Sequence, residues 1–144
     1  MAILDLHSRY VLQWQLSNTL EADWCVETLQ QSLRQWGKPH IFNTDQGSQF
    51  TSDNFVGVLQ AHHIAISWDG KGRALDNIYV ERFWRTLKYE DVYLRNYQTG
   101  HELRAGLVRY FHYYNHQRPH QSLGYRTPAA VLKEGKEKQL KSVN

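Results

Sequence analysis

The sequence predicts an α/β protein with a mixed sheet flanked by helices, because strand-like segments alternate with segments of helical periodicity. Residues 1–16 are predicted to form a β-hairpin, since two runs of apolar, β-branched and aromatic residues are joined at His7-Ser8. Residues 40–44 and 64–68 are predicted to be two further strands, each lying between two helical segments. A chain of 144 residues with this pattern is expected to form one domain.

Helices are predicted between and after these strands, over residues 18–36, 51–62, 77–89 and 99–115, with a short last helix from residue 128. Capping residues mark most of their starts: Asn18 with Glu21, Asp76, Thr99 with Glu102, and Thr127 before Pro128. Gly37 and Pro39 are expected to end the first helix. Residues 1–132 are therefore assigned to one folded core, and residues 133–144 to a charged, flexible tail.

Composition limits the classes of protein that fit the chain. Hydrophobic residues make up 41% and charged residues 22% of the sequence, which is typical of a soluble globular protein. No apolar run approaches the ~20 residues of a membrane-spanning helix, and the N-terminus has no signal-peptide pattern. Cys25 is the only cysteine, so the chain can form no internal disulfide, and we expect a cytoplasmic protein without a membrane partner.

The formal net charge of +3 is unevenly distributed along the chain. Residues 1–99 carry nine Lys and Arg and eleven Asp and Glu, a net −2, whereas residues 100–144 carry eight and three, a net +5. A basic C-terminal third suits a polyanionic partner. The alternative interpretation is a solvated, charged helical tail.

The stretch FNTDQGSQFT, residues 42–51, places a carboxylate where a strand ends and a turn begins. Asp45 follows the apolar residues of the predicted strand and precedes Gly47. Its side chain could cap the next helix, or it could hold a metal ion. Asp45 taken alone does not distinguish these two interpretations.

The predicted helix over residues 77–89 has two different faces. Its apolar face consists of residues at helical spacing, namely Val80, Phe83, Trp84 and Leu87. Glu81, Arg85 and Lys88 form a separate polar stripe together with Asn77. In one interpretation this stripe is a solvated face, with an ion pair of Glu81 and Arg85 worth about 0.3–0.5 kcal/mol. In the other, Glu81 is a metal ligand and the two cations bind phosphate groups beside it.

Taken together, these features resemble the retroviral-integrase-like transposases of bacterial insertion sequences, the DDE class with an RNase H-like fold. The matching segments are NTDQGSQFTS (residues 43–52), GRALDNIYVERFWRTLKYE (residues 72–90) and YNHQRPHQSLGYRTPAA (residues 114–130). The segment ILDLHSRYVLQW (residues 3–14) is similar to the second and third strands of that family. The 35 residues between Asp45 and Glu81 strengthen the resemblance, which extends to about residue 132.

The resemblance implies a metal-dependent reaction on DNA. Asp45 would be the family's second catalytic aspartate and Glu81 its glutamate, and together they would hold Mg²⁺ or Mn²⁺, as two ions if the site is active. The ions would promote phosphodiester cleavage and strand transfer in DNA transposition and integration.

The resemblance also implies contacts with transposon-end and target DNA. Arg85 and Lys88 match positions where related integrases place cations against the DNA end, and Lys71 and Arg73 are expected to contact DNA from the preceding loop. These contacts would position the DNA rather than read its sequence. Transposases of this class usually act as multimers, so a homo-oligomer is expected.

The family's first catalytic aspartate has no counterpart in this sequence. In the family it lies on the first strand of the sheet, which precedes the hairpin, so the first strand is expected to be missing from an N-terminally truncated chain. Asp5 is acidic and early, but its surroundings match the second strand, and we expect it to support the hairpin turn rather than bind metal. Two hypotheses therefore stand beside an active transposase: a catalytically inactive DNA-binding or subunit-interaction remnant, and an RNase H-like nuclease without strand transfer.

Two clusters in the last third of the chain have alternative interpretations. His112, His116 and His120 are spaced four residues apart and could share a zinc ion, but Pro119 ends the helix before the third histidine, and packing or DNA contact is favoured for it. The aromatic cluster could stack on bases, but is predicted mainly to be helix core; it comprises Tyr110, Phe111, Tyr113 and Tyr114.

Overall fold

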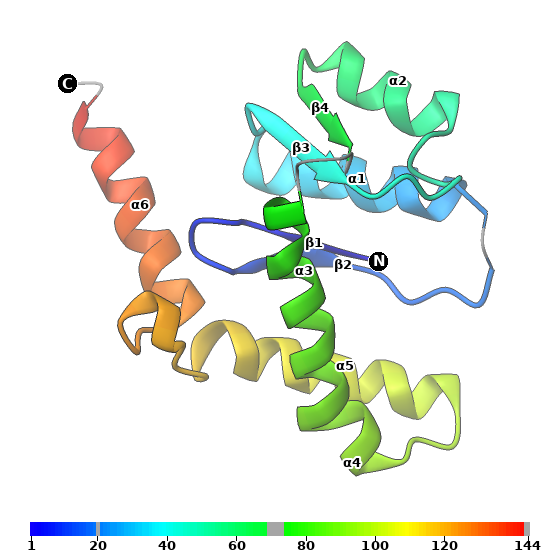
Figure 1. Cartoon of the computed structure of the whole chain (residues 1–144), viewed down its shortest axis with the longest axis vertical. Helices are drawn as coiled ribbons and strands as arrows, with labels where there is room; N and C mark the ends of the chain where they lie inside the picture. The colour runs from blue at the N-terminus through cyan, green and yellow to red at the C-terminus, as the bar shows by residue number, and fades with distance from the viewer. Residues whose placement is uncertain (20, 69–73, 143–144) are drawn as a thin grey trace. The chain divides into compact units, whose positions relative to one another are not determined.

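The computed structural model describes residues 1–19, 21–68 and 74–142 (Figure 1). The chain divides into two compact units. Unit 1 comprises Met1–Ile3 and Leu12–Glu81, and unit 2 comprises Leu4–Val11 and Arg82–Asn144. The N-terminal hairpin and one helix therefore contribute residues to both units.

The predicted hairpin is confirmed, with strands β1 (Ala2–Leu4) and β2 (Val11–Trp14) forming a two-stranded sheet. Met1 and Gln15 exchange two hydrogen bonds at its open end, each 3.0 Å long. This reciprocal pairing of residues 14 positions apart, across a short turn, makes the strands antiparallel. The hairpin pattern was readable from the sequence because both strands and their turn are local.

Unit 1 also contains a parallel pair of strands, β3 (Ile41–Thr44) and β4 (Ala65–Trp68), joined through helix α2 (Asp53–Ala61). Helix α1 (Asp23–Trp36) precedes β3 and contacts α2. Apolar side chains of this unit form one buried cluster, which comprises Cys25, Leu29, Phe55, Leu59 and Ile64. Phe42 of β3 and Ile66 of β4 pack against it. This cluster covers the β3–β4 pair and fixes the strand end that Asp45 follows.

Two predicted helix starts were wrong. Helix α1 begins at Asp23 after Ala22, which makes no side-chain capping hydrogen bond, so Asn18 is not the cap. An acidic residue in the first turn, which the helix dipole favours, marks this start instead. Helix α3 begins at Ala74, so Asp76 lies inside its first turn and is not the cap. Ala74 and Leu75, which precede Asp76, are strong helix formers, and this favours the earlier start.

Other helix ends follow the predicted chemistry. Gly37 ends α1 with φ +83°, a backbone conformation that glycine adopts without strain. The hydroxyls of Thr99 and Thr127 accept hydrogen bonds from the backbone N–H groups three residues further on, at 3.1 and 3.3 Å. The last helix, however, continues to Ser142, whereas residues from 133 onward were expected to be frayed.

Unit 2 is mainly helical beyond the hairpin turn. Helix α3 (Ala74–Leu87) continues into a π-helical turn, η1 (Lys88–Val92), and a single turn, α4 (Tyr93–Arg95); then come α5 (Gly100–His116), η2 (Gln121–Leu123) and α6 (Pro128–Ser142). Phe83 of α3 stacks on Phe111 with ring centroids 5.8 Å apart and meets Tyr114 edge-on at 5.3 Å. The aromatic cluster of α5 is therefore core, as predicted, except for Tyr113, which is exposed.

The predicted mixed α/β architecture is present, but the described strands do not join into one sheet. They form two separate two-stranded sheets, one antiparallel and one parallel. No described strand of one sheet pairs with a strand of the other.

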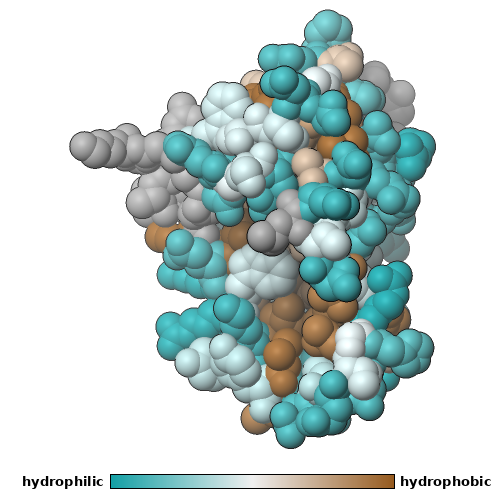
Figure 2. All heavy atoms as spheres, turned by 90° about the vertical axis from the view of Figure 1, so that its right-hand side faces the viewer, coloured by the Kyte–Doolittle hydropathy of each residue, from teal (hydrophilic) through white to brown (hydrophobic). Residues whose placement is uncertain are grey.

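Several large hydrophobic side chains are exposed in the described residues, and Figure 2 shows hydrophobic atoms reaching the surface of one face among hydrophilic neighbours. Those most exposed include Ile41, Tyr89, Tyr93, Leu94 and Tyr125. Within the described residues, no helix has the length and hydrophobicity needed to cross a membrane.

Candidate active site

Asp45 lies directly after β3, at the carboxyl end of the parallel strand pair. Its side chain is exposed, and its Oδ1 accepts a hydrogen bond from the backbone N–H of Gly47 at 2.8 Å. Its other oxygen has no partner among the described residues. The side chain that caps α2 is Ser52, whose hydroxyl accepts from the N–H of Phe55 at 3.3 Å. Asp45 therefore does not cap α2, although its position before the helix would have allowed it.

Gly47 lies close to the Asp45 carboxylate. A Cβ on this residue would lie 2.9 Å from the Asp45 Oδ1, closer than real Cβ atoms approach. Because glycine has no Cβ, its N–H can approach the carboxylate and restrict how it points. The sequence Asp-Gln-Gly thus builds an oriented, solvent-accessible oxygen donor at the end of a buried strand.

Glu81 lies on α3 with its side chain exposed, and it makes no hydrogen bond or ion pair within the described residues. Arg85 and Lys88 are exposed on the same continuous helix. The Arg85 guanidinium lies 5.8 Å from the centroid of the Tyr89 ring, and no described acidic residue pairs with it. Glu81, Arg85 and Lys88 are therefore solvent-exposed, and Glu81 and Arg85 do not form the ion pair of the first interpretation.

The predicted site residues are divided between the two units. Asp45 and Glu81 belong to unit 1, whereas Arg85 and Lys88 belong to unit 2. Lys71 and Arg73 lie outside the described residues. Asp5 holds the hairpin turn: its Oδ2 accepts hydrogen bonds from the Ser8 N–H at 2.8 Å and from the Ser8 hydroxyl. The prediction that Asp5 supports this turn is confirmed.

The exposed carboxylates have the right chemistry for a magnesium ion. Carboxylate oxygens are hard ligands, and Mg²⁺ is usually held by one or two carboxylates together with water and substrate phosphates. Asp45 and Glu81 supply that number of carboxylates, so the donor set fits one ion. Within the described residues, no group of three His, Cys, Asp or Glu side chains is arranged to hold a metal. A second ion would need ligands beyond these two.

The two units differ more in net charge than residues 1–99 and 100–144 do. Unit 1 holds four Lys and Arg and eight Asp and Glu, which give −4, and unit 2 holds thirteen and six, which give +7. The candidate carboxylates therefore belong to an acidic unit, and the exposed cations of α3 and η1 belong to a strongly basic one. A polyanion would be attracted mainly to unit 2.

The segment YNHQRPH, which is part of the resemblance to the family, has structural contacts inside unit 2. The buried side chain of Asn115 pairs with both backbone groups of Val11: its Oδ1 accepts from the N–H at 2.9 Å and its Nδ2 donates to the C=O at 3.0 Å. Helix α5 is thereby fastened to the start of β2. Sequence reasoning missed this role, because the two residues are 104 positions apart.

Glu90 and Arg118 form a second structural pair that the sequence did not predict. The Arg118 guanidinium donates to both Glu90 oxygens, with Nε–Oε2 at 2.8 Å and Nη2–Oε1 at 2.6 Å, and the Tyr110 hydroxyl donates to Oε2 at 2.9 Å. Partial burial acts to raise the pKa of Glu90, but these hydrogen bonds outweigh it and hold the pKa below its ordinary value. Burial and the same carboxylate raise the pKa of Tyr110.

The three histidines of the possible zinc cluster lie in different surroundings. His112 and His116 are exposed on α5, with ring centroids 4.8 Å apart. His120 packs edge-on against the Tyr114 ring at 4.8 Å. Burial, and then the positive charge of Arg118, lower the pKa of His120, and burial raises the pKa of Tyr114 to about 12. The packing role favoured for His120 agrees with these contacts.

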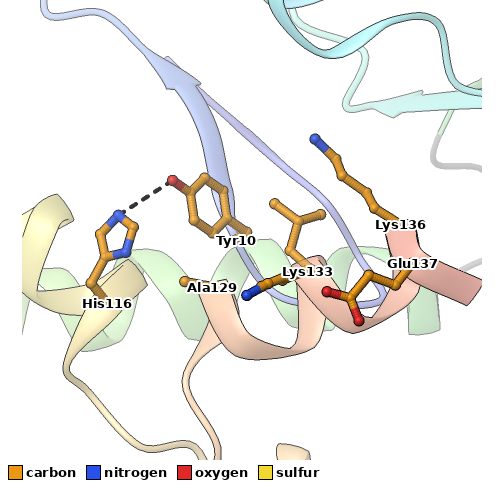
Figure 3. A pocket seen from close by; sticks show the side chains of 7 residues that line it. Tyr10, His116, Ala129, Lys133, Lys136 and Glu137 are labelled. Carbon is orange, nitrogen blue, oxygen red and sulfur yellow. Dashed lines mark hydrogen bonds between the residues drawn. The ribbon is translucent and has the colours of Figure 1, made fainter.

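Unit 2 also contains an open pocket of about 290 Å³ (Figure 3). It lies between Tyr10 and His116, whose hydroxyl and Nε2 are 3.4 Å apart, and one side of α6. Its other lining residues are Ala129, Leu132, Lys133, Lys136 and Glu137. The pocket contains neither Asp45 nor Glu81 and is therefore distinct from the carboxylate site.

Solved structures resemble this fold. The catalytic core domain of BIV integrase matches 95% of the chain and 86% of its own length, with a TM-score of 0.75 and 20% identity. The HTLV-2 integrase catalytic core domain, solved in complex with magnesium in a trimeric form, matches 89% of the chain and 80% of its own length, with a TM-score of 0.66 and 19% identity. The chain therefore has the RNase H-like fold of retroviral integrase catalytic cores.

Sequence comparisons identify the family. Two family models, each described as an integrase core domain, match residues 1–74 and 62–128. The transposase for insertion sequence element IS904 of Lactococcus lactis is 31% identical over 131 residues, covering 87% of the chain and 51% of the relative. Transposase InsF for insertion sequence IS3A of Escherichia coli is 31% identical over 129 residues, covering 88% and 45%. The chain spans about half the length of these relatives.

The RNase H-like fold and the match to the integrase core domain models define the general class as an integrase-like core. The chain belongs to the integrase core domain family, and the relatives that match it are insertion-sequence transposases. The family that the sequence resembled is thus confirmed.

Proposed function

We propose that this chain acts in DNA transposition, by metal-dependent cleavage and joining of phosphodiester bonds. Asp45 and Glu81 are the carboxylates that it contributes to the metal site. Arg85 and Lys88, and also Lys71 and Arg73, contact the DNA backbone. The proposal is supported above all by Asp45 at the carboxyl end of β3, in a chain of this family. A hydrogen bond orients its carboxylate, which does not cap a helix.

The residues would act by holding and orienting rather than by covalent chemistry. The Gly47 N–H restricts the Asp45 carboxylate, so one oxygen stays available to a ligand. Glu81 makes no hydrogen bond or ion pair with the described residues, so none of these residues would compete with a metal ion for its carboxylate. A bound Mg²⁺ would neutralise charge on the attacked phosphate and activate the attacking hydroxyl. Arg85 and Lys88 would hold neighbouring phosphates through charge-assisted hydrogen bonds.

Nicking of supercoiled plasmid tests the proposal, with purified protein and Mg²⁺ or Mn²⁺. The variants Asp45→Asn and Glu81→Gln keep the size of each side chain and remove its charge, and both should lose nicking. Asp53→Asn is the matched control, because Asp53 is an exposed aspartate in the first turn of α2 outside the proposed site. Wild-type nicking by Asp45→Asn would overturn the assignment of that residue.

A second candidate function is a catalytically inactive DNA-binding or subunit-interaction module. It is favoured by the charge of unit 2 and by the presence of only two candidate carboxylates among the described site residues. This hypothesis expects DNA binding that weakens steeply with salt and does not depend on Mg²⁺. If neither wild type nor variants nick DNA while all of them bind it, this second function replaces the first.

A further inference from the structure

A ladder of one cation and two aromatic rings is exposed along the helix that continues from Glu81. The Arg85 guanidinium lies 5.8 Å from the centroid of the Tyr89 ring, and the Tyr89 and Tyr93 rings meet edge to face with centroids 5.4 Å apart. The tyrosines are 62% and 61% exposed. We call Arg85, Tyr89 and Tyr93 the aromatic ladder; all three residues belong to unit 2.

The π-helical turn η1 explains why these rings face solvent. Both carboxylates of this turn are bound: Glu90 by Arg118 and Tyr110, and the buried Asp91 by a hydrogen bond from Tyr97 at 2.8 Å. Tyr89, directly before these two residues, and Tyr93, two positions after them, are exposed. π-Helical turns inside α-helices are uncommon and frequently occur at functional sites. The exposure of both rings is therefore built into the backbone and held by inward-facing hydrogen bonds.

Two exposed tyrosines in contact, beside cations, have the composition of a surface for stacking nucleobases. Every base has a π-face, so stacking on aromatic rings binds single-stranded nucleic acid with little regard to sequence. Arg85 and Lys88 stand within one turn of Tyr89 and could bind the phosphates that connect stacked bases. Base faces inside a duplex are covered by their neighbours, so the ladder suits unpaired bases.

Charge favours nucleic acid over a second copy of this chain as the partner of this surface. Unit 2 carries a net +7, and the ladder and its neighbour Lys88 contribute two of its positive charges. Two copies meeting through this surface would bring like charges together, which costs free energy. A polyanion would gain both the electrostatic attraction and the contact with the rings.

We propose that the aromatic ladder binds unpaired bases of single-stranded DNA. Tyr89 and Tyr93 stack on the bases, and Arg85 and Lys88 hold the adjoining phosphates. The inference rests on the proposed function only in taking DNA as the polymer, because it requires neither a metal ion nor cleavage.

Binding measured by fluorescence anisotropy in EDTA tests the proposal without the metal site. The probes are a labelled oligothymidylate and an abasic oligonucleotide of the same length, which has the same phosphates but no bases. Wild type is expected to bind the oligothymidylate at least about fivefold more tightly, the factor that corresponds to the lower end of the stacking range for one base. The double variant Tyr89→Leu/Tyr93→Leu should bind the two probes equally, and Tyr89→Phe/Tyr93→Phe should keep the preference.

Tyr125→Leu is the control, since Tyr125 is a 71% exposed tyrosine of the same unit outside the ladder. It should retain the preference for bases, and thermal melting should show that all variants fold. Equal binding of both probes by wild type would overturn the proposal. So would a wild-type dimer in sedimentation that the leucine variant converts to monomer without any preference for bases, because the ladder would then be a self-association surface. Failure of plasmid nicking leaves these outcomes unaffected and bears on the proposed function alone.

Discussion

Replacement of Asn115 by leucine should destabilise the protein, because the buried amide of Asn115 joins α5 to the hairpin. Asn115 is 6% exposed and Val11 is 4% exposed, so neither can exchange its hydrogen bonds freely for water. Leucine has a similar size but can neither donate nor accept. The Val11 N–H and C=O would both lose their partner.

The magnitude follows from the number of groups left unpaired. A buried polar group without a hydrogen bond costs about 1–3 kcal/mol, and two such groups are created. Burial of the leucine side chain recovers part of this loss. We therefore expect Asn115→Leu to lower the free energy of unfolding by about 2–4 kcal/mol, a large share of the 5–15 kcal/mol typical of a whole protein.

Urea unfolding followed by circular dichroism measures this loss, and hydrogen exchange at the Val11 amide localises it. Asn54→Leu is the control: Asn54 is exposed on α2, so its replacement should change stability by less than about 0.5 kcal/mol. An Asn115→Leu variant with the wild-type urea midpoint and a protected Val11 amide would refute the reasoning. The segment containing Asn115 would then need a different role, such as DNA contact.

Two further predictions concern unit 2. Gly106→Ala places a Cβ against the Tyr97 hydroxyl, which also donates to buried Asp91, so it should cost about 1–3 kcal/mol and lower the melting temperature. The added change Tyr97→Phe should restore part of the loss, and an unchanged melting temperature would contradict this packing. The lowered pKa of His120 means that the unfolded chain binds more protons below pH 6.5, so this residue makes stability fall as pH drops from 6.5 to its folded pKa. His120→Asn should flatten that part of the stability curve; an unchanged slope would show that other groups cause it.

The sequence determined the features whose causes are local. The hairpin, the strands beside Asp45 and the caps at Thr99 and Thr127 follow from alternation, turn residues and hydroxyl groups within a few positions of one another. The apolar face of α3 was readable because helical spacing places Phe83 and Leu87 together, and both are buried. The family was recognised for the same reason, from contiguous segments around Asp45 and at residues 72–90 and 114–130.

Local patterns failed where several local starts were possible. Asn18 and Asp76 both had good capping chemistry, yet the helices begin elsewhere, because a capping residue permits a helix start without requiring it. The charged composition of residues 133–142 suggested fraying, whereas α6 runs through them and pairs Glu134 with Arg126 and Lys138 at 2.5 and 2.7 Å. Strong helix formers and these ion pairs favour the longer helix.

Only the tertiary structure decided how distant residues are used. It assigned Asn115 to Val11 and Arg118 to Glu90, partners that lie 104 and 28 positions apart. It also inserted the π-helical turn that buries Asp91 and exposes the neighbouring tyrosines. No periodicity in the sequence encodes these choices, because they depend on which polar groups meet inside the folded unit and must satisfy one another away from water.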